Sequence, residues 1–200
     1  MNLRVVLLLC LAVLLLAGCD KLGLSSPRNT ASYQGVDITG ADYQYALTDH
    51  NGQPRTPADF KGKVTVVFFG YTQCPDVCPT TMAELAQVKK ALGKDGERLQ
   101  AVFISVDPER DTPEGLKAYM SSFDPSFIAL RGSAEETAAT AKAFKAFYAK
   151  APGKTPGSYS VDHSTGSYVF DTQGRVRLFE SYGRGAEPLI ADLKALLIAG

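Results

Sequence analysis

A short run of consecutive apolar residues, 64–69, constrains the fold of this 200-residue chain more than any other feature. The run is rich in β-branched and aromatic side chains and is bounded by Gly62 and Gly70. Such a run is typical of a strand with both faces buried, as in a sheet that helices cover. A second run of this kind spans residues 99–106, which favours an α/β domain.

Helix-start signals alternate with these strand signals. Thr81 and Glu84 fit a capping box and predict a helix that ends near Leu92 and Gly93. Thr112 and Pro113 suit the cap and first turn of a helix that reaches about Phe123. A further capping box at residues 133–136 predicts a helix to about Tyr148, and a closing helix is expected over residues 187–198.

The remaining segments complete a mixed α/β order. Alternation at Tyr43, Tyr45 and Leu47, ended by a turn at residues 51–52, predicts an N-terminal β-hairpin. A brief strand is expected over residues 127–130, a loop over residues 150–160, and a second hairpin over residues 167–171 and 176–179. We therefore expect a central mixed sheet flanked by helices, with the site residues at the carboxyl ends of its strands.

The N-terminus carries an export signal. Residues 5–17 are thirteen uninterrupted apolar residues, whereas a transmembrane helix needs roughly 20 and a buried core helix needs a polar face. Residues 16–19, Leu-Ala-Gly-Cys, resemble the bacterial lipobox. The resemblance implies a signal peptide of residues 1–18, a lipidated Cys19, a tether over residues 19–31 and a domain over residues 32–200. Asp20 resembles the signal that retains a lipoprotein at the periplasmic face of the inner membrane.

Charge and cysteine content narrow the function further. The 21 basic and 21 acidic side chains are balanced and interspersed, which argues against a nucleic-acid partner. Of four cysteines, Cys10 leaves with the signal peptide and Cys19 is acylated, so Cys74 and Cys78 remain. Outside the cytoplasm such a pair forms a disulfide, a metal site, or both in turn.

The spacing of Cys74 and Cys78 suits either state. The two cysteines are separated by four positions at the start of a helix, so they share one face and their Cα atoms are about 6 Å apart. That distance allows a disulfide or the binding of one soft metal ion. The helix N-terminus is expected to lower their thiol pKa values. A general dithiol oxidoreductase of this architecture would carry Cys-x-x-Cys, and the extra residue here favours a bridging metal that needs a third ligand.

Only two histidines can supply that ligand. His50 lies in a turn, where a solvated side chain is the plainer explanation. His163 follows the long loop and can return to the site end of the sheet. Asp162 or a nearby carbonyl could hold the tautomer of its imidazole.

Three segments together resemble the Sco/SenC copper chaperones: residues 70–79, 105–114 and 162–164. The resemblance covers about residues 32–198, with Gln73 standing where many members have His. It implies a thioredoxin-like fold that binds one copper ion, as Cu(I) or Cu(II), through Cys74, Cys78 and His163. The bacterial lipoprotein form of the family is expected, anchored in the membrane by lipid.

The resemblance also implies a client. The family helps to assemble the binuclear copper centre of cytochrome c oxidase by delivering copper, by reducing the oxidase cysteines, or both, so the expected partner is its copper-accepting subunit or another copper enzyme. A thiol reductase is a further expected partner. The acids of residues 105–114 either shape the partner surface or form a helix cap and turn. The alternatives are a metal-independent thiol-disulfide reductase, with Cys74 and Cys78 as a redox-active disulfide, and a peroxidase.

Overall fold

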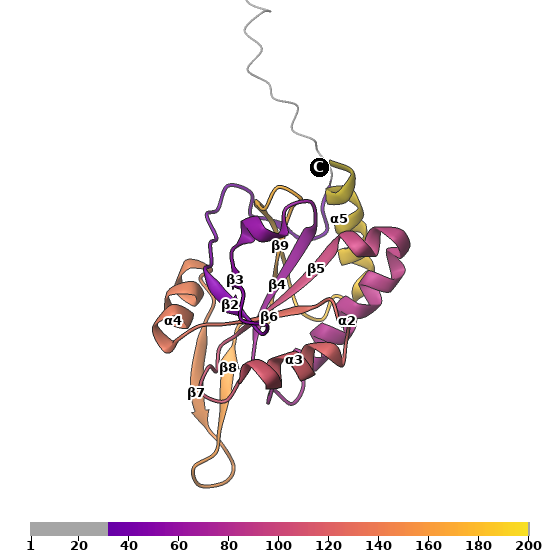
Figure 1. Cartoon of the computed structure of the whole chain (residues 1–200). Coiled ribbons are helices and arrows are strands. Elements are labelled where there is room, and N and C mark those ends of the chain that lie inside the picture. Colours follow the sequence, from indigo (N-terminus) through magenta and orange to yellow (C-terminus); the bar gives the residue numbers. More distant parts are fainter. Residues whose placement is uncertain (1–31, 200) are drawn as a thin grey trace, which may run out of the picture. The chain divides into compact units, whose positions relative to one another are not determined.

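A mixed eight-stranded sheet forms the centre of the molecule, with the strand order β1-β10-β9-β4-β5-β6-β2-β3 (Figure 1). The computed structural model describes residues 32–199. The two predicted buried runs are the central strands β4 (Val64–Gly70) and β5 (Leu99–Ser105), which pair in parallel. Every residue of both strands is buried. The expected α/β architecture with a mixed central sheet is confirmed.

The outer strands include both predicted hairpins. On one side of β4 lie β9 (Ser167–Phe170), β10 (Val176–Glu180) and β1 (Val36–Asp37), all paired antiparallel. On the other side, β6 (Ile128–Arg131) pairs in parallel with β5, and the N-terminal hairpin of β2 (Leu47–Asp49) and β3 (Pro54–Arg55) joins β6.

The predicted first strand is shorter than its alternating pattern suggested. Tyr43 and Tyr45 lie outside β2, although Tyr45 is buried. The ring of Tyr43 stacks on Phe144 with centroids 5.1 Å apart. The alternating pattern therefore marks side chains that pack on the core, but the residues before Leu47 do not pair as a strand.

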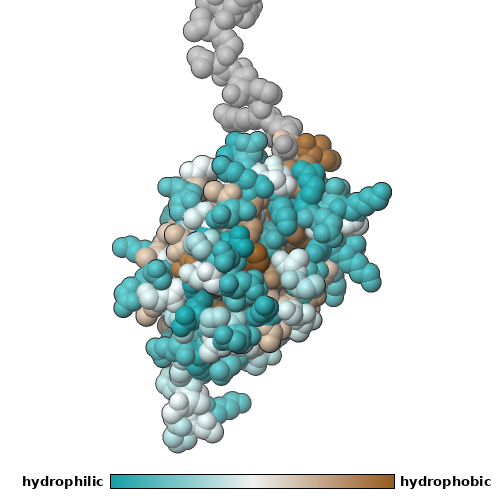
Figure 2. All heavy atoms as spheres, viewed as in Figure 1, coloured by the Kyte–Doolittle hydropathy of each residue, from teal (hydrophilic) through white to brown (hydrophobic). Residues whose placement is uncertain are grey.

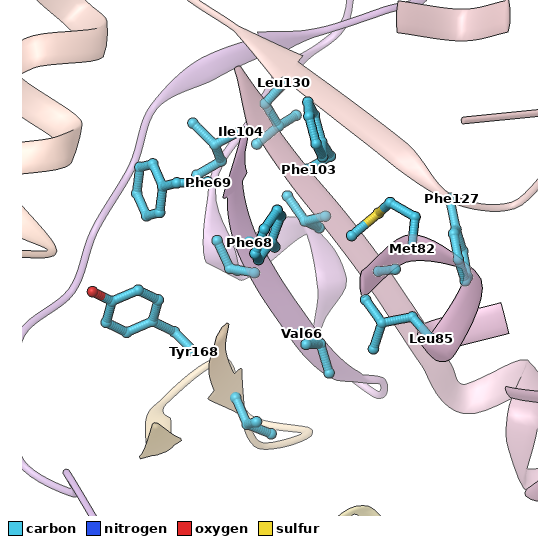
Figure 3. Close-up of a cluster of buried hydrophobic side chains, with 14 of the residues drawn as sticks. Val66, Phe68, Phe69, Met82, Leu85, Phe103, Ile104, Phe127, Leu130 and Tyr168 are labelled. Carbon is cyan, nitrogen blue, oxygen red and sulfur yellow. The ribbon is translucent and has the colours of Figure 1, made fainter. Parts of the chain in front are cut away.

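Helices cover both faces of the sheet. Helices α2 (Val77–Ala91) and α5 (Ala186–Ala199) contact each other, and α4 (Ala134–Ala143) lies on the opposite side of the sheet (Figure 1). Helix α3 (Pro113–Ser121) contacts β6, and two short 3₁₀ helices span Pro57–Phe60 and Gly93–Arg98. Met82 and Leu85 of α2 pack on one side of β4 and β5, with Phe69 and Tyr168 on the other (Figure 3).

The helix caps were predicted with mixed success. Thr112 accepts a hydrogen bond from the Gly115 amide, and Ser133 forms the predicted capping box with Glu136. The capping box at Thr81 is wrong, because α2 already begins at Val77 and the Thr81 hydroxyl donates to the Val77 carbonyl inside the helix.

Two boundaries near residue 148 also differ from expectation. Helix α4 ends at Ala143, and Lys145 adopts a left-handed conformation with φ 53°. The predicted loop over residues 150–160 is instead largely a hairpin of β7 (Tyr148–Pro152) and β8 (Tyr159–His163). Pro152 is the last residue of β7, and Gly153, Pro156 and Gly157 lie in the connection between the two strands. This hairpin forms a separate two-stranded sheet.

Hydrophilic residues cover most of the face seen in Figure 2. Among the described residues, the large apolar side chains that are exposed are Val36, Phe147, Tyr182 and Ile198. No helix over residues 32–199 combines the length and apolarity needed to cross a bilayer. The predicted signal peptide, lipidated Cys19 and tether lie outside the described residues.

Candidate metal and thiol site

The structure brings together the three residues that the sequence singled out as ligands. Cys74 lies in the loop after β4, Cys78 is the second residue of α2, and His163 is the last residue of β8. One sulfur or nitrogen atom from each lies within 4.8 Å of the others. Cys78 Sγ is 3.3 Å from His163 Nε2, and the Cys78 amide donates to Cys74 Sγ at 3.5 Å.

The two cysteines are free thiols that differ in exposure. Cys78 is 0% exposed, whereas Cys74 is 8% exposed. Cys74 and His163 line a groove of about 420 Å³ between the cysteine loop and β8. A partner or ligand therefore reaches the site from the side of Cys74 and His163.

A glycine at the end of β4 makes room for the buried thiol. A Cβ atom on Gly70 would lie 2.8 Å from Cys78 Sγ and 2.7 Å from the ring of Phe103. Both contacts are too short for carbon, so a side chain here would push the thiol or the ring away. From the sequence, Gly70 was interpreted only as the end of a strand, and its role in making room for the thiol was not predicted.

His163 is held with Nε2 directed at the thiols. Its Nδ1 lies 2.9 Å from the Ser164 carbonyl oxygen. Because a carbonyl only accepts, Nδ1 carries the proton and Nε2 is free to accept or to bind a metal. The rings of Phe68 and Tyr71 lie almost perpendicular to the imidazole, each with its centroid 5.9 Å from that of His163.

The orienting partner of His163 is thus the Ser164 carbonyl, one of the two alternatives that the sequence left open. The Asp162 side chain is exposed, and its contribution is a charge that opposes the effect of burial. Burial lowers the pKa of His163 below its usual value of 6.5. The imidazole is therefore neutral at pH 7, the form that binds metal.

The expected lowering of the thiol pKa by the helix N-terminus is wrong for Cys78. Burial raises the pKa of Cys78 far above its usual value of 9.0, and the Cys74 side chain raises it further. The Cys78 thiol is therefore protonated at neutral pH in the protein without metal. Its S–H group donates to His163 Nε2, the acceptor that faces it.

The segment after β5 is partly buried. Asp107 and Asp111 are each 1% exposed, so these two acids cannot form a partner surface, whereas Glu109 and Glu114 are exposed. Asp111 accepts hydrogen bonds from the Thr72 amide and hydroxyl and from the Ser105 hydroxyl. It thereby fixes the start of the cysteine loop against the end of β5. The available signal was a cluster of acids directly after a buried strand.

The other singled-out side chains lie apart from the ligand set. His50 Nδ1 accepts a hydrogen bond from the Ala129 amide at 3.1 Å, so it has a structural role in joining the β2 turn to β6. Gln73 is exposed and accepts a hydrogen bond from Arg110 at 3.1 Å.

The three donors form a set that suits a soft metal ion. Thiolate sulfur selects ions such as Cu(I), and imidazole also binds copper. The same two thiols, with no metal between them, are close enough to exchange with a disulfide. The geometry therefore supports both metal binding and thiol chemistry.

Comparison with known proteins gives a consistent family assignment. A family model described as SCO1/SenC matches residues 34–198. The mouse (Mus musculus) Protein SCO2 homolog, mitochondrial, is 34% identical over 157 residues, which cover 78% of this chain and 62% of the mouse protein. The match thus spans less than two thirds of that relative.

Solved structures show the same fold. The structure of Bradyrhizobium japonicum ScoI with copper bound is 44% identical with a TM-score of 0.69, and the match covers 76% of this chain and 97% of that one. A SCO1/SenC family lipoprotein from Bacillus anthracis is 30% identical with a TM-score of 0.68, and the match covers 80% and 96%. The expected thioredoxin-like fold is confirmed.

Proposed function

This chain belongs to the SCO1/SenC family, and on that premise we propose that it is a copper metallochaperone that carries one copper ion as cargo. Cys74, Cys78 and His163 hold the ion. The observation that carries the proposal is the convergence of two sulfurs and one imidazole nitrogen within 4.8 Å at a groove. The 44% identical Bradyrhizobium japonicum relative, whose structure holds copper, supports the choice of metal.

Three ligands leave copper open to an incoming thiolate. Cu(I) accepts low coordination numbers, so a client thiolate can add from the groove before Cys74 or Cys78 leaves, and the ion passes without release to water. Burial of Cys78 behind Cys74 keeps competing ligands on one side of the site. The client we propose is the copper-accepting subunit of cytochrome c oxidase, in line with the family resemblance.

The same thiols can reduce an oxidised client. One thiolate attacks the client disulfide to form a mixed disulfide, and the second thiol displaces the client sulfur. Two electrons and two protons pass to the client, and a Cys74–Cys78 disulfide remains. The Cys78 amide donates to Cys74 Sγ, so the cysteine of the loop lies beside the first turn of α2, which favours this second candidate function.

We also propose that the domain is held at the periplasmic face of the bacterial inner membrane by lipid on Cys19, after removal of residues 1–18. The lipobox-like residues 16–19 support this, and a lipoprotein occurs in the family, in Bacillus anthracis. Two or three acyl chains on one cysteine anchor a protein far more firmly than one. Mass spectrometry of the membrane fraction tests the modification of Cys19.

Copper titration tests the ligand set. Reduced wild type is expected to bind one copper per chain, and Cys74→Ala, Cys78→Ala and His163→Ala each lose tight binding in competition with a Cu(I) chelator. His50→Ala is the matched control, because its imidazole accepts a hydrogen bond from the Ala129 amide and lies outside the group of three ligands. Unchanged affinity in all three ligand variants would overturn the proposal.

Turnover on an oxidised dithiol peptide separates the two candidate functions. If reduction is independent of metal, His163→Ala reduces the peptide as fast as wild type, while either cysteine variant stops the reaction. If copper transfer is the main activity, His163→Ala loses transfer to a copper-free client.

A further inference from the structure

The hairpin that carries His163 belongs to a different sheet from the strand that leads to the cysteines. β7 and β8 pair only with each other, whereas β4, which precedes Cys74, lies in the eight-stranded sheet. Both cysteines lie on one short loop and helix start. The distance between the two sulfurs is therefore set locally. The distance from the sulfurs to the imidazole depends on how the hairpin is held against the rest of the domain.

Arg110 makes the central contacts between the hairpin and the domain. Its Nη1 donates to the Tyr159 carbonyl oxygen at 2.9 Å and to Gln73 Oε1 at 3.1 Å. Its guanidinium lies 3.7 Å from the centroid of the Tyr159 ring and 5.5 Å from that of Tyr71. One planar cation thus joins the first residue of β8 to the cysteine loop.

A buried carboxylate fixes this cation in place. Arg110 Nε pairs with Asp107, whose side chain is 0% exposed, and the Tyr159 hydroxyl donates to the same carboxylate at 2.8 Å. Only 21% of the Arg110 side chain is exposed. A guanidinium suits this position because its fixed fork of donors meets several acceptors at once, which an ammonium group cannot do.

We propose that Arg110 is a positioning residue that holds β8, and with it His163, at binding distance from Cys74 and Cys78. The inference rests on the proposed copper-binding function. Arg110 contacts none of the three ligands, so it acts on the affinity for copper through the imidazole. The dithiol chemistry, which needs only the two cysteines, is independent of it.

Lys150 provides a matched control in the same place. Its ammonium lies 4.6 Å from the centroid of the same Tyr159 ring, and it pairs with Glu109 at 2.7 Å. Both side chains of that pair are at least half exposed, 50% and 64%. Exposed ion pairs of this kind contribute little, so Lys150→Ala removes a hairpin cation without loosening the hairpin.

The experiment compares Cu(I) affinity, measured by chelator competition, in wild type, Arg110→Lys and Lys150→Ala. Arg110→Lys keeps a charge beside Asp107 and is expected to bind copper about 10- to 100-fold more weakly, the usual range for residues that orient metal ligands. Tyr159→Leu, which leaves the Arg110–Asp107 pair intact, is expected to weaken binding in the same direction. Lys150→Ala is expected to stay within about twofold of wild type.

Two further readouts separate positioning from a general loss of structure. In a His163→Ala background, Arg110→Lys is expected to change the residual affinity by less than about twofold, because the imidazole it positions is gone. The equilibrium constant for exchange with glutathione, in which one glutathione disulfide and the dithiol give two glutathione thiols and the Cys74–Cys78 disulfide, is expected to stay within about twofold.

Wild-type affinity in both Arg110→Lys and Tyr159→Leu would overturn the inference. So would an equal loss in the His163→Ala background, or an equal change in the glutathione constant. If wild type itself binds no copper, the proposed function fails instead, and the two failures are thus distinguishable.

Discussion

Glu180, the last residue of β10, predicts a pH dependence of stability that one substitution should remove. Its side chain is 8% exposed and packs so closely on Gly35 that a Cβ there would lie 2.2 Å from Oε1. The pKa of Glu180 is raised from 4.5 to about 7, first by burial and then by the hydrogen bond and charge of Asp192, against an opposing effect of Arg184. The carboxyl group is therefore partly protonated at neutral pH.

The sign and size of the effect follow from the two pKa values. The folded protein holds this proton more tightly than the unfolded chain, so the free energy of unfolding falls as the pH rises from about 4.5 to about 7, and the contribution is constant above that. At about 1.4 kcal/mol per pH unit, the loss is about 3 kcal/mol. Glu180→Gln keeps the shape and never ionises. The free energy of unfolding of the variant, relative to that of wild type, should therefore rise by about 3 kcal/mol as the pH increases from about 4.5 to about 8.

Urea unfolding of wild type and Glu180→Gln at about pH 4.5, 6 and 8 measures this difference directly. Glu97→Gln is the control, because Glu97 is an exposed glutamate in the 3₁₀ helix before β5. The difference in unfolding free energy between Glu97→Gln and wild type is expected to be the same at all three pH values. A difference between Glu180→Gln and wild type that is the same at both ends would refute the argument, since it would mean that the buried carboxyl titrates at its ordinary pH.

Two further predictions concern the thiol site. Burial raises the pKa of Cys78, so copper binding near pH 7 should release its proton and the apparent affinity should rise up to about tenfold per pH unit for each proton released. Calorimetry in buffers of different ionisation enthalpy measures this, and binding with no proton release contradicts it. Gly70→Ala should cost about 1 to 3 kcal/mol of unfolding free energy and weaken copper binding, because its Cβ would meet Phe103 at 2.7 Å. Gly115→Ala in α3, where the nearest contact is the Thr112 hydroxyl at 3.3 Å, should cost less unfolding free energy than Gly70→Ala in the same urea titration.

Local sequence signals predicted much of the fold. The predictions failed where the structure of a segment depends on partners that are distant in the sequence. Strands β4 and β5 followed from continuous apolar runs, and the caps at Thr112 and Ser133 from residues within one helical turn. The β7–β8 hairpin was predicted as a loop, because its Pro and Gly residues mark a turn but give no sign of the strands on either side. Strand pairing depends on a partner that local composition does not specify.

The ligands of the candidate site could be predicted from the sequence, but the contacts that hold those ligands in place could not. Residue type and spacing singled out Cys74 and Cys78 and left His163 as a candidate, the family resemblance implied all three as ligands, and the structure brings them together. The contacts that hold them come from Asp111 and Arg110, in the segment 105–114 that the sequence left open as either a partner surface or a helix cap and turn. A sequence shows that acids and an arginine follow a buried strand, but only the tertiary arrangement shows that they turn inward to meet the cysteine loop and β8.

The thiol pKa shows how magnitude decides between two opposing effects at one residue. A helix N-terminus stabilises a nearby anion by about 0.3 to 1 kcal/mol, and by about 2 kcal/mol in favourable buried geometry. Burial of a charge costs several kcal/mol unless that charge is paired. Cys78 is 0% exposed, and the imidazole that lies 3.3 Å from its sulfur, that of His163, is neutral. Burial therefore prevails, and the thiolate of Cys78 becomes stable only when a cation arrives to pair with it.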